Sequence, residues 1–213
     1  MLSNTWVIIP VKSLTEGKTR LAPAISAEDR AKLIPAMAQD VFGAFADFGE
    51  LPVMVVTSDE RVADLARQFD FEVLVEQSAE GESLAVAHAT EEVRLRGGTG
   101  SLVVPADVPL LTAADVTKIV ASAPEQGSLL VPSRSRRGTN AVLRRPCNLF
   151  PLRFGDDSFE PHCRAARNTG LVLTVLENER IGLDIDTPAD LDAFLACESQ
   201  TGAAKLLRSI RRG

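Results

Sequence analysis

The sequence predicts an α/β fold with a mostly parallel sheet. Three short stretches, Trp6–Val11, Leu51–Thr57 and Leu102–Pro105, are apolar and rich in β-branched residues, as expected of strands buried on both faces. Segments with a helical spacing of apolar residues lie between them. Because strand and helix alternate along the chain, we expect a doubly wound sheet.

The first helix is expected over Glu28–Phe48. Ser26 followed by Asp29 is similar to a capping box and marks its start. Pro35 lies inside this segment and is expected to kink the helix or split it in two, because proline has no N–H to donate to the preceding turn. Three further helices are expected, at Asp59–Phe69, Glu82–Arg96 and Thr112–Ala123.

The pattern changes after residue 126. Two short strands, Leu129–Pro132 and Asn140–Arg144, are expected on either side of a basic loop at Arg134–Gly138. We expect a mixed sheet here, with an antiparallel member. A helix over Asp156–Thr169 and a strand over Leu171–Leu176 follow.

The last part of the chain is expected to be helical. Thr187 and Pro188 supply the N-cap and the first residue of a helix over Ala189–Cys197, where the fixed φ of proline is favourable. The tail from Thr201 to Arg212 is predicted to form a short basic amphipathic helix, which a partner subunit could cover in a homodimer. Since no repeat or linker interrupts the chain, we expect one domain over residues 1–213.

Composition excludes several classes of protein. With 45% hydrophobic and 24% charged residues among 213, the chain has the composition of a globular protein with a sizeable core. Its 23 Lys and Arg against 29 Asp and Glu give a net charge of -6, which disfavours binding to nucleic acid or to an anionic membrane. The three cysteines show no CxxC spacing, and the apolar run Trp6–Val11 is too short for a signal sequence or a membrane span. We therefore expect a cytoplasmic protein.

Basic residues follow the first predicted strand. Lys12, Lys18 and Arg20 lie within nine residues, close to a glycine, and together they would suit a triphosphate. A solvated surface loop is the common alternative for such residues.

Acidic residues lie where two other extended segments end. Asp107 lies between Pro105 and Pro109, directly after a strand, and would suit a magnesium ligand or a turn. Asp184 and Asp186 point to one face of an extended segment, which is costly unless a cation lies between them. Alternatively, one of these two aspartates could cap the following helix instead of binding a metal ion.

A third group of residues would suit a small phosphorylated acid. Arg137, with Arg134 and Arg136 beside it, offers guanidinium groups, and Ser158 offers a hydroxyl at a predicted helix start. His162 lies one turn later and could line the same place. A mobile exposed loop and an ordinary N-cap are the alternatives.

Five segments together resemble the guanylyltransferases of deazaflavin-coenzyme biosynthesis, which act on phospholactate, phosphoenolpyruvate or phosphoglycerate. In order along nearly the whole chain, they read IIPVKSLTEGKTRLAP, PADVPLL, RRGTNAVL, FGDDSFEPH and GLDIDTPADL. The resemblance implies a three-layer nucleotide-diphospho-sugar transferase-like fold. It also implies transfer of GMP from GTP to a three-carbon phosphorylated acid, with release of pyrophosphate and with Mg²⁺ as cofactor.

Carried onto this sequence, the resemblance implies roles for individual residues. The catalytic residues would be Lys12, Lys18 and Asp107, and the metal ligands Asp107, Asp184 and Asp186. The nucleotide would contact Pro10, Lys12, Lys18, Arg20 and Ser83, and the acid would contact Arg137, Thr139, Asn140, Gly155 and Ser158. Where relatives carry Gly-Leu-Asn at the nucleoside, this chain has Gly81-Glu82-Ser83, so the base preference is left open.

Two other functions remain as alternatives at this point. A nucleotidyltransferase for the molybdenum cofactor or for a sugar phosphate would explain the aspartates at the strand ends, but not the RRGTN and FGDDSF segments. A nucleotide-binding regulator without turnover would fit if the carboxylates proved misplaced. All three functions imply small-molecule ligands, and the sequence does not identify the acid.

Overall fold

The computed structural model describes residues 4–11, 18–76 and 81–211. Within these ranges the chain forms one sheet of seven strands, in the order β3-β2-β1-β4-β6-β5-β7. All neighbouring strands are parallel except β6, which runs antiparallel to β4 and β5, so the predicted mixed sheet is confirmed. The strands are β1 Thr5–Pro10, β2 Val53–Thr57, β3 Glu72–Val75, β4 Gly100–Val103, β5 Gly127–Pro132, β6 Thr139–Arg145 and β7 Val172–Val175.

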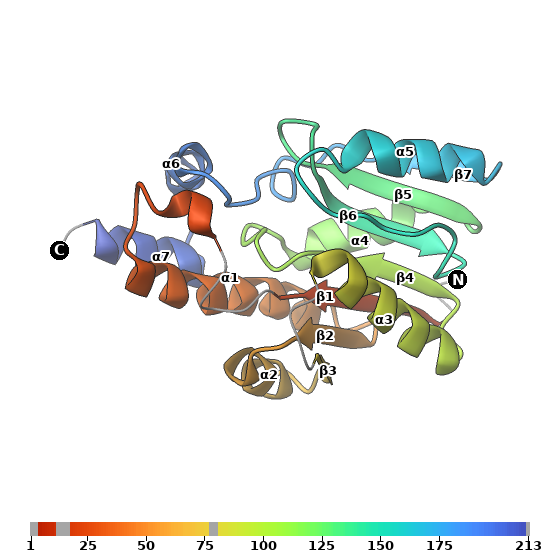
Figure 1. The fold of residues 1–213 in the computed structure, drawn as a ribbon, viewed down its shortest axis with the longest axis horizontal. Helices are drawn as coiled ribbons and strands as arrows, with labels where there is room; N and C mark the ends of the chain where they lie inside the picture. Colours follow the sequence, from red (N-terminus) through yellow and green to blue (C-terminus); the bar gives the residue numbers. More distant parts are fainter. Residues whose placement is uncertain (1–3, 12–17, 77–80, 212–213) are drawn as a thin grey trace.

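Helices cover both faces of the sheet, which gives the molecule three layers (Figure 1). One face packs against α1 (Ala27–Phe48), α2 (Glu60–Arg67) and α4 (Ala113–Ser122), and the other packs against α3 (Glu82–Leu95) and α5 (Phe159–Asn168). Alternate residues of a strand serve the two faces. Val7 and Ile9 of β1 belong to the first core and Ile8 to the second.

Three elements differ from the prediction. The strand β3, at one edge of the sheet, was not predicted. Pro35 does not split α1, which is continuous over 22 residues. Leu33 and Met37 on either side of it are buried, and the burial of two such side chains offsets the roughly 3 kcal/mol that an internal proline costs. The helix expected from Asp156 begins only at Phe159.

The C-terminal helices lie beside α1 at one end of the molecule, on the left in Figure 1. They are α6 (Pro188–Ala196) and α7 (Gly202–Ile210), and a short 3-10 helix, η1, spans Thr19–Leu21. The backbone N–H groups at the start of α7 donate to the carboxylate of Asp40 on α1, at 2.7 and 2.8 Å. Leu207 is fully buried in the same contact. The apolar face of this helix thus packs on α1 of the same chain, and a homodimer stays a prediction.

In the part of the chain that the structure describes, no helix combines the length and the apolar character that a membrane span requires.

Candidate active site

The carboxyl ends of β1 and β4 open onto the candidate site. Asp107 follows β4, and its carbonyl accepts a hydrogen bond from the N–H of Ile185 at 3.0 Å. This single contact brings the segment before α6 alongside Asp107. Ile185 itself is fully buried, so Asp184 and Asp186 on either side of it face the site, as their alternating spacing predicted.

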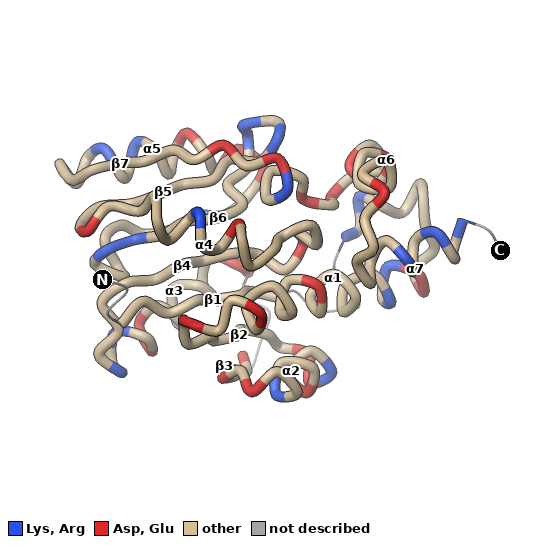
Figure 2. The backbone as a smooth tube through the Cα atoms, turned by 180° about the vertical axis from the view of Figure 1, so that it is seen from behind, with Lys and Arg blue, Asp and Glu red and all other residues tan. Residues whose placement is uncertain are grey.

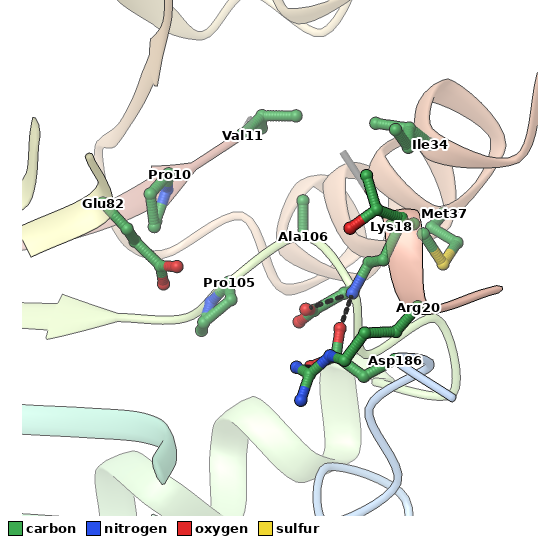
Figure 3. A pocket seen from close by; sticks show the side chains of 12 residues that line it. Pro10, Val11, Lys18, Arg20, Ile34, Met37, Glu82, Pro105, Ala106 and Asp186 are labelled. Carbon is green, nitrogen blue, oxygen red and sulfur yellow. Dashed lines mark hydrogen bonds and ion pairs between the residues drawn. The ribbon is translucent and has the colours of Figure 1, made fainter. Parts of the chain in front are cut away.

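Lys18 joins two of these carboxylates (Figure 3). Its ammonium lies 2.6 Å from Asp107 Oδ2 and 2.5 Å from Asp186 Oδ1. Arg20, two residues further along η1, donates to Asp186 at 2.5 Å and to Asp156 at 2.9 Å. Lys18 and Arg20, two of the cations predicted to hold a triphosphate, therefore lie in one cluster with Asp107 and Asp186, and the alternative of a solvated surface loop is wrong for Lys18.

Charge and burial act together in this cluster. Burial by itself would lower the pKa of Lys18, but the charges of Asp107 and Asp186 raise it above its usual value. Burial, followed by the charge of Asp107, raises the pKa of Asp184 well above its usual range. The three carboxylates of Asp107, Asp184 and Asp186 thus outnumber the two cations Lys18 and Arg20 beside them. A bound cation would neutralise this excess negative charge.

The donor set suits Mg²⁺. Among the described residues no three acidic, histidine or cysteine side chains are grouped as one metal cage. Mg²⁺ usually needs only one or two carboxylates, with substrate phosphates and water completing an octahedron. In the structure the Lys18 ammonium lies between Asp107 and Asp186, where a positive charge is already stabilised. Asp107 with Asp184 or Asp186 would therefore be a sufficient ligand set.

Neither Asp184 nor Asp186 caps α6. Thr187 is the N-cap residue, its side chain accepts from the N–H of Asp190, and the Asp190 carboxylate accepts from the N–H of Thr187. The capping alternative for the aspartate pair is therefore wrong, and both carboxylates remain available to the site.

Two adjoining cavities extend from this cluster. The smaller, of about 190 Å³, is lined by Pro10, Lys18 and Arg20, with Ile34 and Met37 of α1 on the same wall. The larger, of about 530 Å³, is lined by the loop between β5 and β6, by the start of α5 and by the segment before α6. The two cavities share lining residues such as Asp107 and Asp186, so ligands in the two cavities would both lie beside these carboxylates.

Thr139 and Ser158 form the neutral part of the larger cavity. Both side chains are buried, and Ser158 Oγ accepts from the Thr139 N–H at 3.1 Å. Asn140 lies beside them and donates to Asp184 at 3.0 Å. Of the residues predicted to bind the acid, Asn140 thus orients a candidate metal ligand, while Ser158 makes no side-chain cap for α5.

Gly155 and Arg137 also line the larger cavity, and their contact with the acid stays a prediction. Gly155 has a φ of 152°, which only glycine adopts without strain. Arg137 is exposed and pairs with Asp157 at 2.7 Å. Figure 2 shows the basic loop that carries it as a blue stretch at the edge of the molecule.

Ser83 contacts the loop before α5. Its hydroxyl accepts from the N–H of Phe154 at 2.9 Å, and it is not among the described residues that line either cavity. Ser83 therefore ties α3 to the loop that carries Gly155, and its contact with the nucleoside stays a prediction. Lys12 lies outside the described residues.

Several lining residues were not predicted. Figure 3 shows Glu82 across the smaller cavity from Lys18, and Glu82 lines both cavities. Glu82 directly follows Gly81, where relatives carry Gly-Leu-Asn at the nucleoside. This position could have predicted that Glu82 lies at the site. Ile34 and Met37 gave none, because their spacing on α1 is that of any core-facing helix.

The fold is that of the nucleotide-diphospho-sugar transferases. A solved structure from Desulfovibrio desulfuricans G20, provisionally named as such a transferase, superposes with a TM-score of 0.80 over 99% of this chain and 98% of that chain, at 18% identity. The predicted fold class is confirmed.

Sequence comparison identifies the family. Residues 5–212 match the model of the family described as guanylyl transferase CofC like. The 2-phospho-L-lactate guanylyltransferase of Methanothermobacter thermautotrophicus is 33% identical, over 98% of this chain and 92% of the relative. The phosphoenolpyruvate guanylyltransferase of Sphaerobacter thermophilus is also 33% identical, over 94% of this chain and 97% of the relative. The chain belongs to the CofC-like guanylyl transferase family, and neither alternative function is favoured.

Proposed function

We propose that this protein transfers GMP from GTP to a three-carbon phosphorylated acid and releases pyrophosphate, as a step in deazaflavin-coenzyme biosynthesis. The observation that carries the proposal is the contact of Lys18 with Asp107 and Asp186 at the junction of two cavities. One cavity presents cations to a triphosphate, and the other presents the Thr139 hydroxyl and the start of α5 to a small anion.

The reaction needs little acid–base chemistry from the protein. The phosphate of the acid is already an anionic nucleophile. Its oxygen forms a bond to the α-phosphorus of GTP while the bond from that phosphorus to the departing pyrophosphate breaks. No general base is required, so catalysis rests on positioning and on charge neutralisation.

Each part of the site has a role in this scheme. Lys18 and Arg20 would hold the triphosphate, and Lys12 is predicted to join them. Asp107, with Asp184 or Asp186, would hold Mg²⁺, which when bound neutralises charge on the α-phosphate and on the leaving pyrophosphate. Thr139, Gly155 and Ser158 would orient the acid, Ser158 through its hydrogen bond to the Thr139 hydroxyl, and Asn140 would hold Asp184 in place.

The test is pyrophosphate release with GTP and Mg²⁺. 2-Phospholactate, phosphoenolpyruvate, 2-phosphoglycerate and 3-phosphoglycerate are offered separately, with CTP and ATP as nucleotide controls. Turnover with GTP and one acid supports the proposal and identifies the substrate. Folded protein that binds GTP but is silent with all four acids contradicts it. A cytoplasmic location and a homodimer stay predictions.

A further inference from the structure

His162 on α5 is buried at the back of the larger cavity, with 1% of its surface exposed. Both of its ring nitrogens have partners. Nε2 lies 2.9 Å from the backbone nitrogen of Arg153, and Nδ1 lies 3.0 Å from Thr139 Oγ1. The edge of the ring packs against Phe154, with the centroids 5.4 Å apart. The imidazole therefore has one fixed position.

The backbone partner decides where the ring proton lies. A backbone N–H can only donate, so Nε2 of His162 must accept from Arg153. In a neutral ring the proton is then on Nδ1, which donates to Thr139 Oγ1. Burial lowers the pKa of His162 to about 4, which keeps the ring neutral at neutral pH.

Thr139 Oγ1 accepts a hydrogen bond from a second donor. The Ser158 hydroxyl donates to Thr139 Oγ1 at 3.3 Å while accepting from the Thr139 backbone N–H. A hydroxyl oxygen has two lone pairs, so His162 and Ser158 occupy both. The Thr139 hydroxyl can then only donate, and Thr139 lines the larger cavity.

We propose that His162 is a positioning residue that fixes the Thr139 hydroxyl as a hydrogen-bond donor to an anionic oxygen of the acid substrate. The inference rests on the proposed function and deepens it, since it states which kind of atom this point of the site accepts. A phosphate or carboxylate oxygen is suited to it, and a group that can only donate is excluded.

Two substitutions of His162 test the hydrogen bonds of its two ring nitrogens separately. The side-chain nitrogen of asparagine occupies the place of Nδ1, and the terminal amide of glutamine reaches the place of Nε2. His162→Asn keeps the donor to Thr139 and loses the acceptor for Arg153, whereas His162→Gln keeps the acceptor and loses the donor. A structural role alone predicts similar losses for both variants, or a greater loss for His162→Asn, which is the smaller side chain.

We expect His162→Gln to raise the KM for the acid roughly three- to tenfold, the effect of one lost hydrogen bond. The KM for GTP should stay within about twofold. His162→Asn should restore most of the affinity for the acid, to within about twofold of the unsubstituted protein. Equal losses in the two variants, or a change confined to the KM for GTP, overturn the inference.

Thr139→Val tests whether His162 acts through Thr139. Adding His162→Gln to Thr139→Val should cost little more than Thr139→Val alone, because the donor that His162 orients is already gone. Independent, multiplicative losses of affinity for the acid overturn the inference.

A measurement on the unsubstituted protein keeps the inference testable if a variant does not fold. The chain has two histidines, so ¹⁵N labelling of histidine resolves both rings. A proton on Nδ1 of His162 supports the inference, and a proton on Nε2 overturns it. If no acid gives pyrophosphate release, the proposed function fails while this measurement still decides the tautomer.

Discussion

The two cavities of the site are lined by groups of different chemistry. The smaller cavity presents full charges, with Lys18 between Asp107 and Asp186 and Arg20 beside them. The part of the larger cavity around Thr139 presents neutral groups that hydrogen bond to one another. Charges act strongly but with little direction, whereas hydrogen bonds in a fixed network act weakly but select orientation. Substitutions in the first cavity should therefore affect rate and stability most, and those in the second should affect the choice and affinity of the acid.

The largest effect is expected from Asp107→Asn. It removes a carboxylate at the junction of the two cavities while preserving the shape of the side chain. We expect turnover to fall by about 100- to 1000-fold, with the fold retained, because charge neutralisation at the reacting phosphate is lost. Asp64→Asn on the exposed face of α2 is the matched control and should leave turnover unaffected. A folded and fully active Asp107→Asn protein would contradict the assignment of Asp107 as a Mg²⁺ ligand.

Lys18→Met should reveal the surplus of negative charge. Without its ammonium, Asp107 and Asp186 lack the cation between them, and the free energy of unfolding should fall by about 2 kcal/mol. Urea denaturation with and without millimolar Mg²⁺ measures this loss. Because Mg²⁺ would take over the charge, it should stabilise this variant more than the unsubstituted protein. Lys32→Met, which breaks an exposed pair with Glu28, should show no such dependence on Mg²⁺.

The neutral part of the larger cavity should be sensitive to mild acid. Burial lowers the pKa of His162 to about 4, below its usual value near 6.5 in an unfolded chain. The unfolded state therefore takes up a proton first, and stability falls as the pH drops from about 6.5 to about 4. The loss can reach about 3 kcal/mol. Urea denaturation at pH 7 and pH 4.5 should show a flatter dependence for His162→Gln. An identical dependence in the variant would show that His162 is not its cause.

The smallest effect is expected from Arg137→Ala. Arg137 lines the larger cavity, but its guanidinium is exposed and already paired with Asp157. We expect the KM for the acid to rise by about threefold, with no change in kcat, because exposed ion pairs and contacts are weak. Steady-state kinetics with Asp157→Asn as a control should separate loss of the guanidinium from loss of the ion pair. A rise in the KM for the acid above about thirtyfold would mean that the larger cavity also binds the acid through a full charge, that of Arg137.

Local sequence determined the elements and most of the residues around the site. Buried strands and amphipathic helices have patterns that follow from their own periodicity, and Thr187 with Pro188 marks the start of α6 because capping is a local interaction. Asp107, Asp184 and Asp186 could be placed at one edge because strand ends in such a sheet meet there. Resemblance to a family supplied the reaction and the roles of Thr139, Gly155 and Ser158.

Tertiary structure decided which of these groups contact one another. Lys18 lies 89 residues from Asp107 and 168 from Asp186, and no local pattern sets such a pairing. The Ser83 hydroxyl accepts from the Phe154 N–H, and the start of α7 donates to Asp40 on α1. The proton of His162 depends on a backbone N–H nine residues away. These outcomes depend on distances between separate elements in the folded chain, whereas periodicity and capping depend only on neighbours along it.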